Sequence, residues 1–129
     1  MQVIFTDNAP GPAGHYAQAI VHDGLVYVSG QLPIDPATGA KVLGPVEDQT
    51  MQALKNLSAI LEAAGSDIRQ VVKVTVYISD INLWNRVNAV YAQFFSDHKP
   101  ARSVVPTRDL HFGFKVEIDA IAAVSENSE

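Results

Sequence analysis

The chain has no cysteine among its 129 residues, which excludes disulfides and thiolate chemistry. No apolar run approaches the roughly 20 residues that a membrane-spanning helix needs, and the start M-Q-V-I lacks the basic and apolar regions of a signal peptide. Basic residues are also few: nine Lys and Arg against fourteen Asp and Glu give a formal net charge of -5. We therefore expect a soluble cytoplasmic protein with no membrane partner, and the charge argues against nucleic acid as a ligand.

Sequence signals for metal binding and covalent catalysis are also missing. The histidines show neither H-x-x-x-H nor H-x-H spacing, so we predict no metal site and no cofactor. Ser103 follows Arg102 directly, but no motif places a histidine or lysine base beside it, so we interpret it as part of a pocket wall. With 47% apolar residues and no internal repeat or linker, residues 1–129 are expected to form one domain.

The first half of the chain predicts a hairpin followed by a helix. Two strand-like runs flank Asp23-Gly24, a pair that tolerates positive φ in a two-residue turn. The composition of D-P-A-T-G favours another turn at 35–39. Apolar residues over 47–64 then recur at the spacing of one buried helix face, and Gly65 is placed to end that helix.

The segment 71–79 predicts a strand, because it is rich in β-branched residues. Strict alternation would bury one face of this strand completely, with the members Val72, Val74, Val76 and Ile78. A second helix is expected to start near Asp80 or Asn82, either of which can cap it, and to end before Pro100. Its inward-facing residues are expected to be Trp84, Val87, Tyr91 and Phe94.

A short strand is expected around Arg102, and a last strand over 114–124. The last strand alternates between an apolar face and a second face, formed by Lys115, Glu117, Asp119 and Ile121. The element order is therefore β-β-α-β-α-β-β, which predicts an α+β fold with both helices on one face of a mixed sheet. The tail at 125–129, S-E-N-S-E, has the composition of a disordered end.

Seven separated segments carry a more specific pattern. They are G-H-Y-A-Q-A-I, V-S-G-Q-L-P-I-D-P-A-T-G, Q-T-x-Q-A-L-K-N-L-x-A-I-L-E-A-A-G, V-V-K-V-T-V-Y-I-S-D, V-N-A-V-Y-A-Q-F-F, P-A-R-S-V-V and V-E-I-D-A-I-A. In this order the sequence closely resembles the Rid family of enamine and imine deaminases, also called the L-PSP family. The resemblance implies a chorismate-mutase-like fold and a homotrimer with active sites in the clefts between subunits. It also implies hydrolysis of short-lived 2-imino acids, such as those derived from 2-aminoacrylate, to 2-keto acids and ammonia.

The resemblance further implies roles for individual residues. Arg102 falls on the family's carboxylate-binding arginine, and Glu117 falls on the acid that holds a water near the substrate. The family's other pocket positions fall on Tyr16, Ser29, Gly30, Asn88 and Val104. The chain departs from the family where His15 replaces the usual proline, where Val104 replaces a frequent cysteine, and along 106–114. These departures surround the implied pocket, so the resemblance does not fix the side chain of the substrate.

The chemistry of a 2-imino acid suits these two residue types. Such a substrate offers a carboxylate beside an electrophilic carbon, so its hydrolysis needs an anchor, a placed water and a route for protons. The planar fork of an arginine meets a carboxylate with two parallel hydrogen bonds, which lysine does not reproduce. A glutamate accepts a proton when water adds and returns it to the leaving amine. Arg102 is therefore predicted to anchor the substrate and Glu117 to activate the water.

Each assignment has an alternative. By residue type alone, Arg102 fits a solvated surface charge. Glu117 and Asp119 share one strand face, which fits an acid pair or an ordinary solvated face. Tyr16 fits a core aromatic, and Asn88 fits a helix residue bonded to a neighbouring loop. Two other functions also stay open, namely an endoribonuclease on single-stranded RNA and a protein that binds keto or imino acids without turnover.

Overall fold

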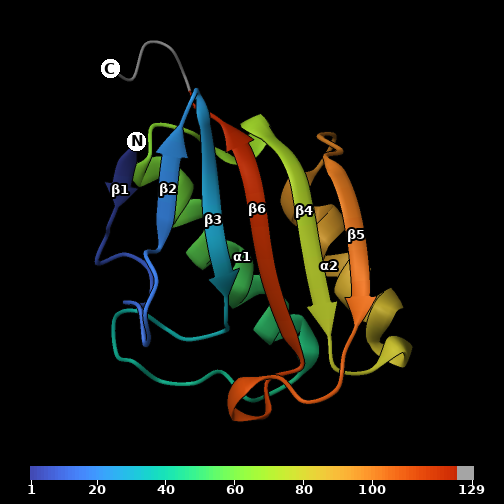
Figure 1. Ribbon diagram of the computed structural model, residues 1–129. Helices are drawn as coiled ribbons and strands as arrows, with labels where there is room; N and C mark the ends of the chain where they lie inside the picture. The colour runs from blue at the N-terminus through green and yellow to red at the C-terminus, as the bar shows by residue number, and fades with distance from the viewer. Residues whose placement is uncertain (125–129) are drawn as a thin grey trace.

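A six-stranded mixed sheet with two helices forms the fold of residues 1–124, the part of the chain that this computed structural model describes (Figure 1). The strands are β1 (Gln2–Ile4), β2 (Ala19–His22), β3 (Leu25–Gln31), β4 (Val71–Ile78), β5 (Ala101–Pro106) and β6 (Val116–Ala123). Their order across the sheet is β1-β2-β3-β6-β4-β5, with β4 and β5 parallel and the other neighbours antiparallel. The predicted α+β architecture is confirmed, and the predicted disordered tail lies outside the described residues.

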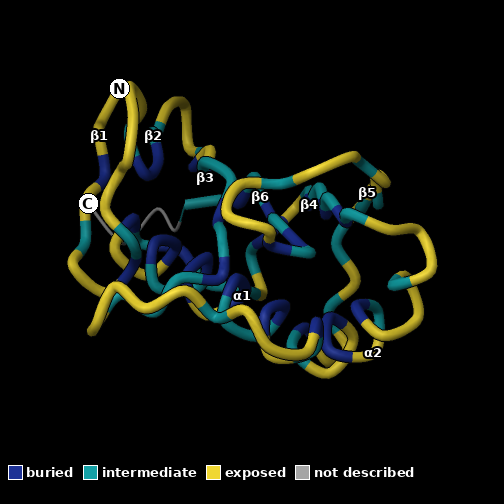
Figure 2. The backbone as a smooth tube through the Cα atoms, turned by 90° about the horizontal axis from the view of Figure 1, so that it is seen from below, coloured by how far each residue is buried: buried dark blue, intermediate teal, exposed yellow. Residues whose placement is uncertain are grey.

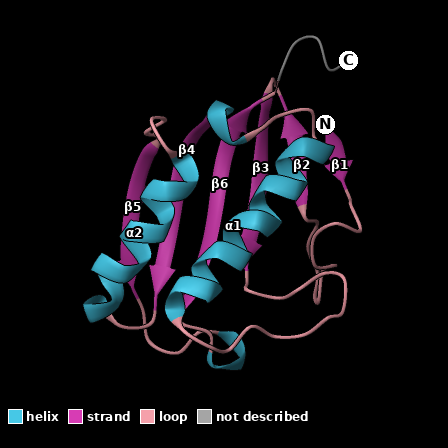
Figure 3. Cartoon of the chain, turned by 180° about the vertical axis from the view of Figure 1, so that it is seen from behind, coloured by secondary structure: helices cyan, strands magenta, loops and turns pink. Residues whose placement is uncertain are grey.

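Two helices, α1 (Val46–Ala63) and α2 (Trp84–Phe95), lie side by side over one face of the sheet (Figure 3). The apolar positions predicted for α1 are buried, and they are Ala53, Leu54, Leu57, Ile60, Leu61 and Ala64. Gly65 ends α1 at a φ of 80°, and the N–H of Ser66 then donates to the carbonyl of Leu61. The buried stretches of the chain gather between the helices and the sheet (Figure 2), so one core lies on this side.

The predicted hairpin is formed by β2 and β3. Asp23 and Gly24 have φ values of 51° and 78°, the two positive values that this tight turn requires. Further along β3, the register against β6 is irregular over the stretch that contains Ser29 and Gly30. A bulge of this kind changes the direction of side chains and often lies next to a functional site.

The alternation predicted for β4 is wrong at its first two residues. Val71 is buried and Val72 is 48% exposed, which is the reverse of the prediction. The register of β4 against β6 shifts between Val71 and Lys73, so an extra residue in β4 interrupts the period of two. The predicted buried face holds from there on, with Val74, Val76 and Ile78 in the core.

The first strand, β1, is absent from the predicted order. It has three residues, too few to show a period of two, and it forms by pairing antiparallel with 19–21 of β2. The side chain of Ile4 adds to the core from this edge of the sheet. The turn predicted at 35–39 is present, because the N–H of Gly39 donates to the carbonyl of Asp35 at 2.8 Å.

The start of the second helix differs slightly from the prediction. The carboxylate of Asp80 accepts the N–H of Asn82 at 2.9 Å and caps one 3₁₀ turn, and α2 begins after it at Trp84. Val87 and Tyr91 are buried as predicted, but Trp84, the first residue of α2, is 37% exposed. No helix within residues 1–124 combines the length and apolar content needed to span a membrane.

The alternation predicted for the last strand is confirmed along β6. The side chains on its apolar face are buried beneath the helices, and they are Val116, Ile118, Ala120 and Ala122. Glu117 and Asp119 therefore point to the opposite face, which no helix of residues 1–124 covers. We call this the open face of the sheet.

Candidate active site

One cavity on the open face brings together several of the predicted site residues. It has a volume of about 340 Å³, and we call it the Glu117 cavity. The predicted residues that line it are Tyr16, Ser29, Gly30 and Glu117. The other lining residues are Ala13, Gly14, Leu32, His111 and Phe112. The loop before β2, the bulge of β3, the segment before β6 and β6 itself thus meet at one place.

The polar groups of Tyr16 and Ser29 are held by the backbone around them. The hydroxyl of Ser29 donates to the carbonyl of Ala17 at 2.7 Å. The hydroxyl oxygen of Tyr16 accepts the N–H of Ala13 at 3.2 Å. Tyr16 is 51% exposed, so it lies at the mouth of the cavity and not in the core. Both side chains are therefore oriented by contacts within the chain itself.

The carboxylate of Glu117 receives no hydrogen bond from any side chain or backbone group of residues 1–124. Gly30 makes room for it, because a Cβ atom at Gly30 would overlap the carboxylate. Burial raises the pKa of Glu117, while nearby His111 lowers that pKa and the charge of Asp119 raises it further. Glu117 thus combines a raised pKa with free acceptor positions, which suits an exchange of protons with a bound water.

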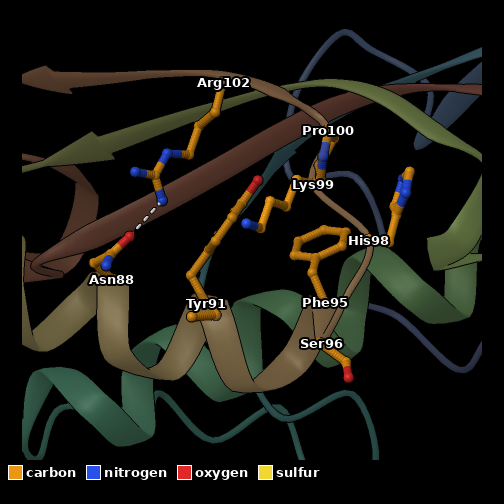
Figure 4. Close-up of a pocket in the computed structure, with 9 residues that line it drawn as sticks. Asn88, Tyr91, Phe95, Ser96, His98, Lys99, Pro100 and Arg102 are labelled. Atoms are coloured by element: carbon orange, nitrogen blue, oxygen red, sulfur yellow. Dashed lines mark hydrogen bonds between the residues drawn. The ribbon is translucent and has the colours of Figure 1, made fainter.

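Arg102 lies in a second cavity of about 400 Å³, between β5 and α2, which we call the Arg102 cavity (Figure 4). Its Nη1 donates to Oδ1 of Asn88 at 2.8 Å. The guanidinium carbon lies 4.6 Å from the ring centre of Tyr91 and 5.5 Å from that of Trp84. The aromatic stack and the hydrogen bond fix the plane of the guanidinium, and its other N–H groups have no acceptor within residues 1–124.

The remaining wall of the Arg102 cavity follows the end of α2. Its residues are Ala92, Phe95, Ser96, His98, Lys99 and Pro100. Burial raises the pKa of Tyr91 to about 12, while the charge of Arg102 lowers that pKa, so the ring beneath the guanidinium stays neutral. The two cations of this wall, Arg102 and Lys99, make the cavity suited to an anionic group.

Arg102 and Glu117 lie on opposite faces of the sheet. Arg102 is opposite Val74 in the register of β5 and β4, and the side chain of Val74 is buried beneath the helices. Glu117 is opposite Tyr77, on the open face. One chain therefore does not bring the two side chains to one ligand, and a site that uses both needs residues from two copies.

Three further residues that the sequence singled out, Asn88, Asp119 and Val104, lie outside the Glu117 cavity. Asn88 contacts Arg102 and not a neighbouring loop. Asp119 accepts the hydroxyl of Tyr77 at 3.3 Å and does not line the Glu117 cavity. Val104 packs against the core and lines neither of the two cavities.

Ser103 has a basic neighbour that no motif predicts. The Nζ of Lys73 donates to the hydroxyl oxygen of Ser103 at 2.9 Å. Neither Ser103 nor Lys73 lines the Glu117 cavity or the Arg102 cavity, so this pair lies outside both. Within residues 1–124, no three His, Asp or Glu side chains come together in a way that would hold a metal ion.

Sequence reasoning left open whether His111 shapes the pocket and did not single out Phe112, and both residues line the Glu117 cavity. Both precede Gly113, and Phe112 and Gly113 both have positive φ values, 59° and 76°. The signal in the sequence was the departure from the family pattern along 106–114. That departure did not reveal which side chains face the cavity, because the direction depends on the unusual backbone at Phe112.

Comparisons with known proteins agree with this architecture. The family model described as Endoribonuclease L-PSP matches residues 6–124. A human 2-iminobutanoate/2-iminopropanoate deaminase is 46% identical over 121 residues, which cover 94% of this chain and 88% of that protein. A RutC family protein of Pyrococcus horikoshii is 50% identical, over 94% of this chain and 96% of that protein.

Solved structures share the fold along almost the whole chain. The crystal structure of E. coli TdcF with bound serine has a TM-score of 0.92 at 40% identity, over 97% of this chain and 100% of that chain. The YjgF gene product of E. coli has a TM-score of 0.91 at 40% identity, over 95% and 98% of the two chains. By sequence and by fold, the chain therefore belongs to the Rid family, also known as the YjgF or L-PSP family.

Proposed function

We propose that this protein hydrolyses reactive 2-imino and 2-enamino acids to 2-keto acids and ammonia. The observation that carries the proposal is the Glu117 carboxylate, which lines a cavity, has a raised pKa and has no hydrogen-bond partner within residues 1–124. The similarity to a human protein named for deamination of 2-iminobutanoate and 2-iminopropanoate supports the substrate class. No metal or cofactor is required for this reaction.

The proposed hydrolysis starts from the protonated imine. Water adds to the carbon of the protonated imine while Glu117 accepts one proton from that water. The carbon then bears a hydroxyl and an amino group, and Glu117 returns the proton to the amine nitrogen. The C–N bond breaks and ammonia leaves, while the hydroxyl gives its proton to the ionised Glu117 and its oxygen becomes the keto oxygen of the product. Glu117 then releases this proton to solvent, which restores the carboxylate. An enamine first takes a proton on its terminal carbon and then follows the same route.

Arg102 supplies the anchor for the substrate carboxylate in this scheme. Its free N–H groups offer a charge-assisted, bidentate contact, and Asn88 holds the guanidinium in place from α2. Since Arg102 and Glu117 point to opposite faces of the sheet, the proposed site combines the Arg102 cavity of one copy with the Glu117 cavity of a neighbour. We propose a homotrimer as the assembly that brings the two cavities together.

The proposed reaction is tested by following ammonia and 2-keto acid release from imines made in the same vessel by an amino acid oxidase or a dehydratase. Faster release with the purified protein is expected, and the mass of the assembly is measured by light scattering. A spontaneous rate that the protein does not increase would refute the reaction, and a monomer mass would refute the trimer.

A mixture of two inactive variants tests whether the site is shared between copies. Glu117→Gln and Arg102→Ala chains are unfolded together, refolded as mixed assemblies and assayed. A shared site takes Glu117 from one chain and Arg102 from another, so random mixing restores roughly a quarter of the wild-type sites. Each variant refolded alone is the control. If the mixture stays as inactive as its components, the site does not combine these residues from two copies.

The same preparations also separate the proposal from its rivals. The matching family is described as Endoribonuclease L-PSP, so RNA cleavage is the first rival to test. Single-stranded RNA is incubated with the wild type and with Arg102→Ala. The net charge of -5 argues against RNA as the substrate, and we expect no cleavage. A pure binding protein would be stabilised by 2-keto acids without releasing ammonia.

A further inference from the structure

Phe112 presents an aromatic surface to the Glu117 cavity. It lines the cavity and yet remains 53% exposed. Leu32 and Tyr16 line the same cavity, so part of its wall is apolar although Glu117 is polar. The proposed hydrolysis uses Glu117 but assigns no role to this apolar wall.

The backbone at Phe112 is strained. Its φ of 59° and ψ of 17° lie in the left-handed region, where a bulky residue is uncommon and where glycine or asparagine would fit at lower cost. Gly113, the next residue, also has a positive φ. A strained residue at the wall of a functional cavity points to a role for its side chain, because folding alone would favour a residue that relieves the strain.

Two contacts hold the ring of Phe112 in place. Its edge meets Phe114 at 5.9 Å between ring centres and 83° between planes, and Phe114 is buried. The Nζ of Lys41 lies 4.7 Å from the ring centre. Lys41 itself does not line the Glu117 cavity. The fixed ring therefore gives the cavity a rigid apolar surface.

We infer that Phe112 is a specificity-determining residue that selects 2-imino acids with apolar side chains longer than a methyl group. This inference rests on the proposed deaminase function. With the reacting carbon next to Glu117, the substrate side chain packs on the ring of Phe112 and is removed from water. Each methylene buried there is worth roughly a fourfold preference, whereas a carboxylate on the ring would lose hydration in a cavity that already holds the carboxylate of Glu117.

The test compares kcat/KM on imines with alanine-like, leucine-like and glutamate-like side chains. Wild type is expected to prefer the leucine-like imine over the alanine-like one by about tenfold, the value of one to two buried methylenes, and to disfavour the glutamate-like one. Phe112→Ala removes the ring and should bring the ratio of leucine-like to alanine-like rates close to one.

A second variant separates a role in specificity from a role in folding. Phe112→Gly removes the same ring and also relieves the strained backbone, so we expect it to show the loss of selectivity with a melting temperature above that of Phe112→Ala. The matched control is Phe5→Ala, which removes another exposed aromatic ring, one that lies outside the cavity. This control should leave the ratio unchanged.

The possible outcomes distinguish this inference from the function on which it rests. A wild type that hydrolyses none of the imines would refute the proposed function and the inference together. An active wild type whose selectivity survives in both Phe112 variants would refute the inference alone. An equal loss on all three imines, or a change in the mass of the assembly, would assign Phe112 to structure and would also overturn the inference.

Discussion

The Arg102 cavity and the Glu117 cavity are built in different ways. Arg102 belongs to a regular strand and is held by a hydrogen bond and an aromatic stack from α2. The Glu117 cavity is assembled from the loop at 13–16, the bulge at 29–30 and the segment 111–113, and its carboxylate has no hydrogen-bond partner within residues 1–124. An anchor benefits from a fixed direction, whereas a proton acceptor needs free lone pairs. The two constructions thus match the two roles that we propose.

The largest expected effect comes from Glu117→Gln. The amide keeps the shape of the side chain but does not accept a proton from water, so kcat/KM should fall by about 100-fold to 10,000-fold while 2-keto acids still bind. The readouts are imine hydrolysis and a ligand-induced shift in melting temperature. The control is Asp119→Asn, which changes another carboxyl on the open face outside the cavity. Similar losses of kcat/KM in Glu117→Gln and Asp119→Asn would show that activity depends on negative charge on the open face and not on Glu117 specifically.

Arg102→Lys tests the anchor and should have the next largest effect. A lysine keeps the charge but not the two parallel donors, so it should behave almost like Arg102→Ala. Loss of a charge-assisted contact costs on the order of 2 to 4 kcal/mol, hence about 30-fold to 1000-fold in kcat/KM. Melting curves should change little. Arg69→Lys, at an exposed arginine, is the control, and near-normal turnover by Arg102→Lys would remove Arg102 from the site.

Part of the grouping of the predicted site residues follows from the sequence. The family resemblance places Tyr16, Ser29, Gly30 and Glu117 in one pocket with Arg102, Asn88 and Val104. The first four line one cavity, whereas Arg102 and Asn88 line the other and Val104 lines neither. Alternation along β6 also predicted correctly that Glu117 points away from the core. The direction of Glu117 is predictable because a period of two along a long strand depends mainly on local pattern.

Other features depend on contacts that the sequence does not display. The face to which Arg102 points is set by the pairing of β5 with β4, and Asn88 on α2 then orients the guanidinium. The strand β5 is an edge strand without clear alternation of apolar residues. The bulge after Val71 reverses the side chains at the start of β4. The left-handed backbone of Phe112 decides that its ring lines the Glu117 cavity. Each of these features is set by tertiary packing and not by local preference.

Gly30→Ala should have an intermediate effect on the Glu117 side. A methyl group at this position overlaps the carboxylate of Glu117, which can swing away because it ends a flexible side chain. We therefore expect a stable protein with a fall in kcat/KM of roughly tenfold, as for a misplaced catalytic group. Gly11→Ala is the control, since a Cβ atom there would meet nothing within 4 Å.

A double variant sharpens the prediction for Gly30. If the methyl group acts only by displacing Glu117, then adding Gly30→Ala to Glu117→Gln causes no further loss of activity. If the double variant instead shows the product of the two single losses in kcat/KM, then Gly30 acts on the substrate through another route, such as its own backbone groups.

The smallest expected effect concerns stability and pH. Burial raises the pKa of Glu117, so the folded protein binds this proton more tightly than the unfolded chain does. The ionised carboxylate therefore destabilises the fold at pH values above its folded-state pKa, and this cost disappears as the pH falls below the unfolded value of about 4.3. Glu117→Gln removes the charge, so its melting temperature should exceed that of wild type near pH 7, by a small amount because the carboxyl is partly solvated.

The pH dependence of that difference identifies its cause. The gain in melting temperature of Glu117→Gln should shrink as the pH falls from 7 toward 4, where wild type also carries a neutral side chain at this position. No partner within residues 1–124 stabilises the charge of Glu117 by a hydrogen bond. A difference in melting temperature that instead grows as the pH falls would mean that a hydrogen bond stabilises the ionised carboxylate of Glu117. Glu117 would then be held by a contact as Arg102 is, which would contradict the contrast between the two cavities.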